Sequence, residues 1–401
     1  MLGGYFWVIY SKGWDAGLFT IGMSAGACLL VYLTRHSSLL QRASAYVAFF
    51  TTPLLTLTGQ ISVLTGFAGT SNAAHWFGVS FVTASLAHAI YQNTLSPKLL
   101  LLSLLQPARW NSGPCAVHTK NQPHFRAPWR SSARLVANFQ WIVLGAFFYG
   151  VASSAIWRVL ILKHSSQPMD VLLFAAAFEL YVYFNFAGIS FIVFGLMRLV
   201  GVPCQCNFNT PFVARNVVGY WQRWHMSLSA ILKAIFFIPL KRKIGLPLTV
   251  LAVFLGSAVW HGISINFIIW GCFHAACWFL SYKLSGVTGS QRWVQVALLF
   301  FAVLIGRLIF SESDAPVLWE KLSALISLDS WRETPIWPHI HLDWQNHAAL
   351  LVAFFWFLAE ASGCKLVRRY KILRTPVTST LLFLCVIVFG SFDMGGVYGR
   401  R

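Results

Sequence analysis

The sequence predicts an all-α polytopic membrane protein, a bundle of about nine to eleven transmembrane helices. Hydrophobic residues make up 57% of its 401 positions and charged residues only 10%, whereas a soluble domain carries about a quarter charged residues. Many of the apolar runs are close to the length of about twenty residues that crosses a bilayer. Basic residues gather in the short stretches between these runs, which is typical of cytoplasmic loops.

The amino-terminal third is expected to contain three spans and one shorter piece. The spans are residues 16–33, residues 43–67 and a run that begins near Ala73. Residues 96–106 are too short to cross alone and fit a re-entrant or interfacial segment. The apolar patch 3–10 has neither a preceding basic region nor a small-residue cleavage site, so we do not interpret it as a secretory signal.

The rest of the chain continues the same alternation of apolar runs and polar connections. The expected spans are 135–157, 171–200, 246–260, 265–280, 294–309, 350–364 and 377–392. We find no internal repeat and no separate soluble domain, so residues 1–401 are expected to form one integral-membrane domain, with carboxy-terminal spans within 348–396.

The distribution of charge predicts a topology. The net charge is +19, but it comes largely from loops 107–134, 201–245 and 365–374, which the positive-inside rule places in the cytoplasm. Segment 311–347 holds six of the eleven acidic residues and is expected outside. This pattern indicates membrane topology and attraction to anionic lipids rather than nucleic-acid binding. We expect a multi-pass protein of the cytoplasmic (inner) membrane.

The eight cysteines show no disulfide framework. Cys204 and Cys206 are separated by one residue, but no second Cys/His pair at zinc-finger spacing accompanies them. We therefore expect no metal site.

Residues 219–240 form the most unusual stretch, because polar and aromatic side chains cluster there. Trp221, Arg223, Trp224 and His225 precede an apolar helical run, and His261 follows in an apolar stretch with no charge between 246 and 280. A histidine at membrane depth is costly unless it has a partner or a function. Taken alone, His261 also fits a helix-packing residue, and His225 also fits the membrane interface.

A second polar group falls inside the expected span 171–200. Glu179 and Asn185 lie there, within the sequence FELYVYFNFAG. An acidic residue inside a membrane is a functional candidate. A hydrogen bond that locks two helices together explains it equally well.

Several motifs together closely resemble the membrane-bound O-acyltransferase family. The central ones are NFNTPF at 207–212, YWQRWHMSLS at 220–229, FFIPL at 236–240, VWHG at 259–262 and WGCFH at 270–274. Flanking segments also fit the bacterial branch of that family, which acts in alginate and peptidoglycan O-acetylation and in teichoic-acid D-alanylation. These are GVSF at 78–81, SGP at 112–114, YFNFAG at 183–188 and RLIFSES at 307–313. The resemblance covers residues 78–313.

The resemblance implies a helix bundle pierced by a central tunnel, into which donor and acceptor enter from opposite faces. It implies that His261 is the catalytic histidine and that His225 is a second essential residue toward the cytoplasm. Around this pair we expect substrate-binding roles for a further set of residues, namely Arg223, Trp224, Trp221, Asn207 and Asn185. The donor is expected to be an acyl thioester, acetyl-coenzyme A or an acyl carrier protein, used as a substrate, with no tightly bound cofactor.

The expected reaction moves an acyl group, with acetyl favoured, toward an extracytoplasmic polysaccharide or cell-wall polymer. The resemblance also implies a periplasmic or extracellular partner protein that completes the transfer. D-alanyl transfer from a carrier protein stays open, and so does a transporter or flippase that uses the histidines as a proton relay. The sequence departs from the family pattern at five positions near the cytoplasmic lip and in the membrane, namely Asn185, Gly219, Ile231, Lys233 and Ala234.

Overall fold

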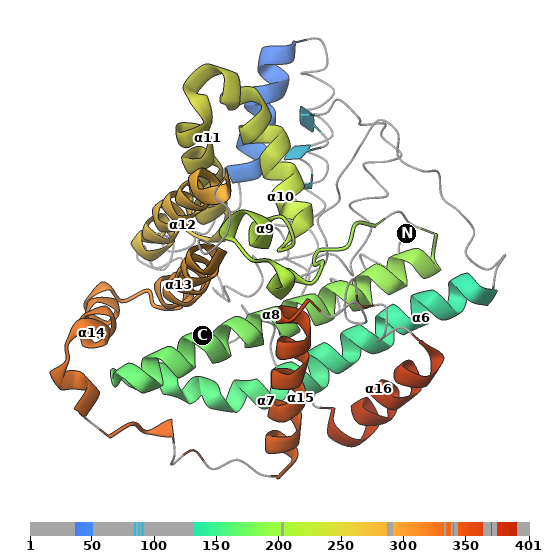
Figure 1. Ribbon diagram of the computed structural model, residues 1–401. Helices are drawn as coiled ribbons and strands as arrows, with labels where there is room; N and C mark the ends of the chain where they lie inside the picture. The colour runs from blue at the N-terminus through green and yellow to red at the C-terminus, as the bar shows by residue number, and fades with distance from the viewer. Residues whose placement is uncertain are drawn as a thin grey trace, which may run out of the picture.

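The computed structural model describes residues 37–50, 84–85, 87–88, 90–91, 132–201, 204–286, 292–332, 334–337, 340, 344–363, 370 and 375–390. These residues are helices and short connections, which confirms the all-α prediction (Figure 1). Five stretches are long and apolar enough to cross a membrane: Ser132–His164, Pro168–Leu199, Met226–His261, Ile265–Lys283 and Trp293–Ser311. The expected spans 16–33 and 43–67 and the run from Ala73 lie mainly outside the described residues, although residues 43–50 of the second are helical.

Two long helical stretches pack side by side and form the base on which the site is built. The first comprises α6 (Ser132–Phe147), the π-helical turn η3 (Phe148–Ala152), α7 (Ser153–Trp157) and η4 (Arg158–His164). The second is the single helix α8 (Pro168–Leu199), which runs alongside it in Figure 1. A Cβ atom added to Gly188 would lie 2.6 Å from the backbone nitrogen of Tyr149 and 2.8 Å from the carbonyl oxygen of Gly145. The two stretches therefore touch backbone to backbone, as small residues allow in membranes.

The start of α8 is fixed by a buried carboxylate. Asp170 lies in the first turn, where an acidic residue complements the helix dipole. Its Oδ2 atom accepts hydrogen bonds from the hydroxyl of Ser165 and the backbone nitrogen of Ile336, both at 2.8 Å. Its Oδ1 atom accepts from the nitrogen of Trp337 at 3.0 Å. This carboxylate thereby ties part of segment 311–347 to the start of α8.

Residues 226–261 fold as a helical hairpin, which corrects one prediction. Helix α10 (Met226–Leu232), the π-helical turn η6 (Lys233–Phe237) and α11 (Ile238–His261) follow without interruption, but the chain bends at Gly245, whose φ is 75°. The arms lie against each other, since a Cβ atom on Gly256 would lie 3.1 Å from the ring of Phe236. Within loop 201–245 the sequence predicts a helical run after His225 that stops at Pro239. The helix instead continues past Pro239 to the bend, and the basic residues 241–243 are exposed there.

The first arm of the hairpin continues past Pro239 for an identifiable reason. A proline has no N–H, so the carbonyl of Ile235, four residues earlier, loses its helical partner. The hydroxyl of Tyr46 donates a hydrogen bond to that carbonyl at 2.8 Å. Because an unpaired carbonyl is costly in a membrane, Tyr46 allows the helix to contain this proline. It also attaches helical residues 37–50 to the hairpin.

Two more spans follow, close to the ranges that the sequence predicts. Helix α12 (Ile265–Lys283) packs against the second arm of the hairpin, and α13 (Arg292–Ser311) packs against α12 and α8. The side chain of Asn266 ties the start of α12 to the end of α13. Its Nδ2 atom donates to the carbonyl oxygens of Ile309 and Phe310 at 3.2 and 3.3 Å.

Segment 311–347 contains helix α14 (Ala315–Ile326) and the turn η9 (Asp329–Arg332). Lys321 lies on α14 and donates to the Oε2 atom of Glu312 at 3.0 Å and to the carbonyl oxygen of Lys163 at 2.6 Å. Burial acts to raise the pKa of Glu312, but the hydrogen bond and charge of Lys321 outweigh it and hold the pKa below its usual value. This pair anchors α14 to the end of η4.

The carboxy-terminal helices close the bundle. Helices α15 (Trp344–Ala361) and α16 (Pro376–Phe389) match the predicted spans 350–364 and 377–392 in part. Glu360 of α15 is 1% exposed. It accepts hydrogen bonds from the hydroxyl of Tyr183 and from the nitrogen of Phe212, each at 2.9 Å. Tyr370 adds a contact between its hydroxyl and that of Tyr183 at 3.0 Å. The carboxylate thus fixes the short turn η5 (Pro211–Val213) against α8.

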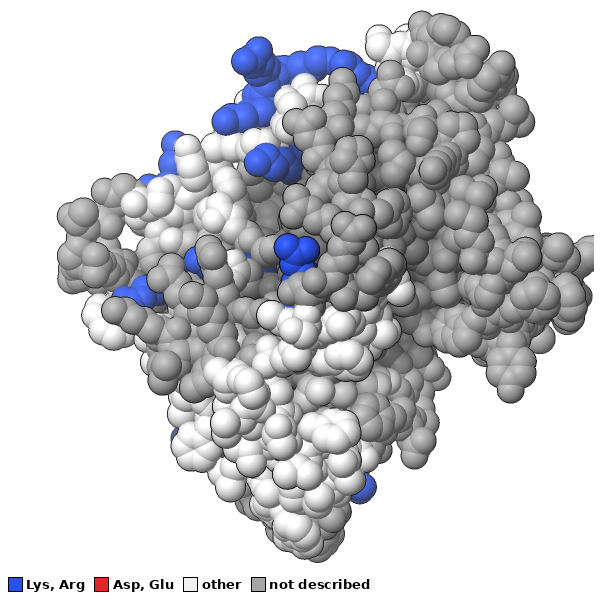
Figure 2. Space-filling view, turned by 90° about the vertical axis from the view of Figure 1, so that its right-hand side faces the viewer, with Lys and Arg blue, Asp and Glu red and all other residues white. Residues whose placement is uncertain are grey.

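Basic side chains mark one face of the molecule. Figure 2 shows several Lys and Arg side chains, most of them in the upper half of the view, and no acidic side chain among the described residues on that face. Lys241, Arg242 and Lys243 are exposed next to the hairpin bend. The positive-inside rule predicts that this bend faces the cytoplasm.

Single cysteines introduced into a cysteine-free variant test this topology. We expect Lys243→Cys and Thr375→Cys to react with a membrane-impermeant maleimide only after the cytoplasmic side is opened, because basic flanks stay inside. Ser327→Cys should react in intact cells, since it lies in the acidic segment. All three positions are exposed. Labelling of both cytoplasmic positions in intact cells would reverse the assignment.

Candidate functional site

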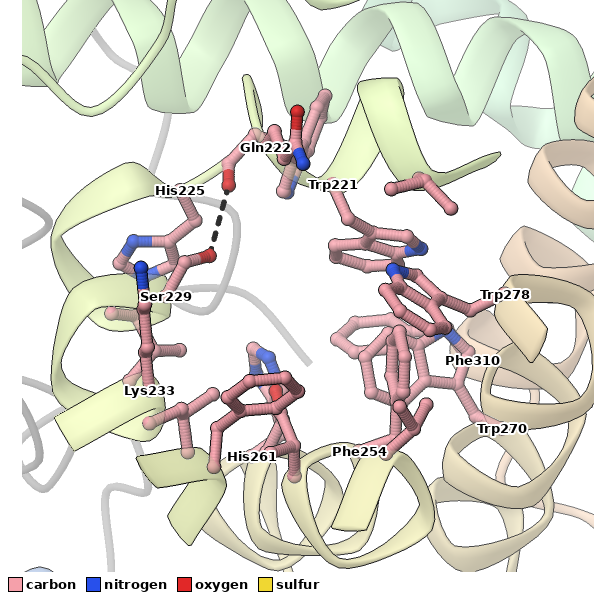
Figure 3. Close-up of a pocket in the computed structure, with 18 of the residues that line it drawn as sticks. Trp221, Gln222, His225, Ser229, Lys233, Phe254, His261, Trp270, Trp278 and Phe310 are labelled. Atoms are coloured by element: carbon pink, nitrogen blue, oxygen red, sulfur yellow. Dashed lines mark hydrogen bonds between the residues drawn. The ribbon is translucent and has the colours of Figure 1, made fainter. Parts of the chain in front are cut away.

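A cavity of about 340 Å³ lies between the helical hairpin and helices α8, α12 and α13 (Figure 3). Its wall also includes the short helix α9 (Val217–Trp221). Both histidines singled out from the sequence, His225 and His261, line it. His225 directly precedes the first arm of the hairpin and His261 ends the second arm. The bend at Gly245 therefore brings together two residues that are far apart along the chain.

The hairpin presents one helical face of each arm to the cavity. On the first arm the lining residues are 225, 228, 229, 232, 233 and 237, and on the second they are 250, 253, 254, 257 and 261. Spacings of three and four residues place side chains on one face of a helix. The cavity therefore extends along the hairpin, from the histidine pair toward the level of Lys233 and Val250.

The two sides of the cavity differ in chemistry. In Figure 3, His225, Ser229 and Lys233 lie along one side. On the other side are aromatic side chains, namely Trp221, Trp270, Trp278, Phe254 and Phe310. Lys233 and Gln222 are exposed, whereas His225 is 6% exposed. The cavity is therefore open to the surroundings near Lys233 and Gln222 and largely closed at His225.

His225 has a strained backbone, as functional residues often do. Its φ is 42° and its ψ is 53°, the left-handed region that non-glycine residues rarely adopt. The following residue, Met226, donates its backbone N–H to the carbonyl oxygen of Asn207 at 2.8 Å. The ring of His225 packs edge to face against Phe186, with centroids 4.7 Å apart. The surrounding loops thus hold His225 in one orientation at the start of α10.

Asn207 acts as a brace for this loop. Its Oδ1 atom accepts from the hydroxyl of Ser227 at 2.6 Å, and its Nδ2 atom donates to the hydroxyl of Ser190 on α8 at 3.1 Å. Because Asn207 is fully buried, these bonds replace hydration that it loses on folding. The sequence predicts Asn207 as a substrate-binding residue, but in the structure it supports the loop that carries His225 and does not line the cavity.

His261 ends the second arm and is surrounded by aromatic rings. The centroid of its ring lies 4.8 Å from that of Trp260, 5.1 Å from Phe310 and 5.8 Å from Trp270. Edge-to-face packing of this kind fixes the ring plane. A histidine nitrogen held in an apolar cavity is suited to accept a proton from a hydroxyl group.

The remaining predicted site residues divide into two groups. Trp221 and Trp224 line the cavity, as a substrate-binding role requires. Arg223 and Asn185 do not line it in the described part of the chain. Asn185 is fully buried in α8, and its amide has no hydrogen-bond partner among the described residues. Both side chains lie beside the site rather than in it.

Arg307 also lines the cavity, and we did not predict it as a site residue. Its Nε atom forms an ion pair with the Oε2 atom of Glu179, the intramembrane acid noted from the sequence. The other carboxylate oxygen of Glu179 accepts a hydrogen bond from the hydroxyl of Tyr220 at 2.6 Å. Burial, followed by the charge of Glu179, raises the pKa of Tyr220 well above its usual value, so the hydroxyl stays protonated. An arginine inside the apolar run 294–309 was the available signal.

The part of the chain that builds this cavity resembles known proteins. The family model described as MBOAT, membrane-bound O-acyltransferase family, matches residues 131–311, which include both histidines and Arg307. A probable alginate O-acetylase AlgI of Pseudomonas aeruginosa is 32% identical over 174 residues, which cover 41% of this chain and 32% of that protein.

Other relatives carry different names. A teichoic acid D-alanyltransferase of Bacillus subtilis is 30% identical over 163 residues, covering 35% of this chain and 40% of that protein. A peptidoglycan O-acetyltransferase of Helicobacter pylori is 26% identical over 180 residues, which cover 41% of this chain and 33% of that protein. The matched part thus spans between about a third and two fifths of the length of these relatives.

Proposed function

We propose that this chain, which matches the membrane-bound O-acyltransferase family over residues 131–311, moves an acyl group from a cytoplasmic thioester toward an extracytoplasmic polysaccharide or cell-wall polymer. The favoured acyl group is acetyl, since alginate and peptidoglycan O-acetylation enzymes are among the relatives. The observation that carries the proposal is the pair of histidines on one largely apolar cavity.

The proposed step is a direct transfer at His261. A nitrogen of its ring takes the proton from an acceptor hydroxyl while the hydroxyl oxygen bonds to the thioester carbonyl carbon. The carbonyl then re-forms and expels the thiolate, which takes the proton back from His261. The aromatic walls exclude water that would otherwise hydrolyse the thioester.

Charge near the open end of the cavity supports donor entry from the basic side. Lys233 lines the cavity, and residues 241–243 are exposed next to the bend. Both acetyl-coenzyme A and an acidic carrier protein are anionic, so either donor would be attracted to these cations. Arg223, which lies outside the cavity wall, would add to the same field. The donor is a substrate in this scheme, and no bound cofactor takes part.

The acceptor and the cellular setting complete the proposal. The protein would lie in the cytoplasmic membrane in contact with its lipids, and a separate periplasmic or extracellular acyltransferase would pass the acyl group to the polymer. This division of tasks is expected because the cavity holds about 340 Å³, which is small for a polymer chain.

Ester analysis of the cell envelope tests the proposal. The gene is deleted in its native cell, and acetate and D-alanine released from envelope polysaccharides by mild base are quantified. We expect loss of acetate esters and their recovery with the wild-type gene. Loss of D-alanine alone would instead support D-alanyl transfer, which the Bacillus subtilis relative favours. Unchanged levels of both would contradict acyl transfer and favour a transporter that uses the histidines as a proton relay.

His225 is expected to orient the donor rather than act as the base. With purified His225→Ala protein in proteoliposomes, the rate should fall and depend more steeply on donor concentration, with partial recovery at high donor. An orienting residue can still contribute about a hundredfold in rate, so the measurement is a full donor titration. A rate that stays near zero at every donor level, with donor binding unchanged, would show that His225 takes part in the chemistry.

A further inference from the structure

Arg307 occupies a position at which a charged side chain costs free energy. It lies in α13 and is the one charged residue in the expected span 294–309. The residue is 8% exposed, and it lines the same cavity as both histidines. A cation at membrane depth needs either a partner or a ligand. Glu179 supplies the partner, which leaves open why this ion pair lies on the cavity wall.

Several elements hold the guanidinium group in one place. Its Nε atom pairs with Glu179 on α8, and Glu179 is fixed in turn by the hydroxyl of Tyr220 on α9. The guanidinium carbon lies 4.8 Å from the ring centroid of Trp224 and 5.9 Å from that of Phe310. Cation–π contacts of this kind hold an arginine against an aromatic face. The group is therefore preorganised before any substrate enters.

The aromatic contacts also bring Arg307 close to His261. Phe310, one of the two rings under the guanidinium group, is 5.1 Å from the ring of His261 between centroids. Trp224, the other ring, directly precedes His225 in the chain. Arg307 and both histidines line the same cavity, so a positive group borders the space where the thioester would react.

We propose that Arg307 is a catalytic residue that stabilises the negative charge formed on the thioester carbonyl oxygen, with Glu179 and Tyr220 as positioning residues. The inference rests on the proposed acyl transfer. When the acceptor oxygen bonds to the carbonyl carbon, one electron pair of the C=O bond moves onto its oxygen. A guanidinium N–H would donate to that oxyanion until the carbonyl re-forms and the thiolate leaves. Donors fixed in advance in a dry site are effective because they need no reorganisation.

A structural role alone is the competing explanation, since the Glu179–Arg307 pair joins α8 to α13. The two roles differ in kinetics. An oxyanion-stabilising group acts only in the transition state, so its loss lowers kcat and leaves KM for the donor nearly unchanged. A group that only joins helices changes stability, and a group that only anchors the donor changes KM.

The experiment compares purified Arg307→Gln, Arg307→Lys and wild-type protein in proteoliposomes. Acetyl-coenzyme A or a D-alanyl-charged carrier protein is the donor, whichever supports wild-type transfer. The acceptor is an envelope extract from cells that lack this gene, which supplies both the polysaccharide and the proposed partner acyltransferase. We expect Arg307→Gln to lower kcat by about 10²–10³-fold, with KM for the donor within about threefold. Arg307→Lys keeps the charge and should recover part of kcat. Arg198→Gln is the matched control, because Arg198 lies on α8, is exposed and is not in the cavity wall.

A double variant distinguishes the loss of a catalytic group from misfolding caused by an unpaired buried charge. Arg307→Gln leaves the Glu179 carboxylate buried without its ion-pair partner, whereas Glu179→Gln combined with Arg307→Gln removes both charges. The double variant should show the same fall in kcat in folded protein. Wild-type kcat in either folded variant, or an effect on KM alone, would overturn the role of Arg307. No transfer by wild-type protein with either donor would instead overturn the proposed function, and the role of Arg307 with it.

Discussion

Replacing His261 with alanine is expected to abolish acyl modification of the polymer while leaving the protein folded and inserted in the membrane. The side chain lines the cavity at the end of α11, so its removal enlarges an existing space. The chemistry loses its proton acceptor, and general-base catalysis contributes about 10²–10⁴-fold in rate. The measurement is the content of base-labile esters in envelope polysaccharide, at equal expression of the variant and the wild type.

His164→Ala is the matched control for this experiment. His164 ends η4, is exposed and does not line the cavity, so its loss should leave ester content unchanged. Tight donor binding by His261→Ala protein would further separate binding from chemistry. Ester levels equal to wild type in His261→Ala cells would remove His261 from the mechanism.

The second large effect is structural and is expected for Gly188→Val. Any Cβ atom at this position would lie within 3 Å of the Tyr149 nitrogen and the Gly145 oxygen. Backbone atoms cannot move aside as a flexible side chain can, so α8 would have to separate from η3 and α6. Overpacking costs about 1–3 kcal/mol and occasionally more, and a backbone clash belongs at the upper end. We expect little folded protein by detergent size-exclusion chromatography.

Leu196→Val controls for the introduction of a β-branched side chain into the same helix. Leu196 is 39% exposed on α8, so the change should be tolerated. Normal yield and thermal stability of Gly188→Val would mean that the helices do not approach as closely as the structure indicates.

Long apolar runs made much of the fold predictable from the sequence. The run 171–200 coincides with α8, and 265–280 and 294–309 lie within α12 and α13. The hairpin was not predictable from the same signals. Pro239, three consecutive basic residues and Gly245 are typical of a loop, and local sequence does not reveal that the distant Tyr46 satisfies the carbonyl left unpaired by Pro239.

The site residues that could be predicted are those that stand out in their local sequence. His225 and His261 stand out because a polar ring in an apolar run is rare, and both line the cavity. Arg307 and Glu179 are far apart in the sequence, so only the packing of α13 against α8 reveals that they form a pair. The amide of Asn207 illustrates the opposite case, because a polar residue in a motif can brace a loop instead of meeting a ligand.

The length of the cavity along the hairpin has a consequence for donor choice. Lys233 follows His225 by eight positions in the chain, and at a rise of about 1.5 Å per residue this separates them by about 12 Å. A donor whose anionic group rests at Lys233 must carry its thioester on an arm of about that reach. The hairpin would then select donors by the distance between their anionic group and their thioester. A donor with a shorter arm could not reach the histidines while its anionic group is bound at Lys233.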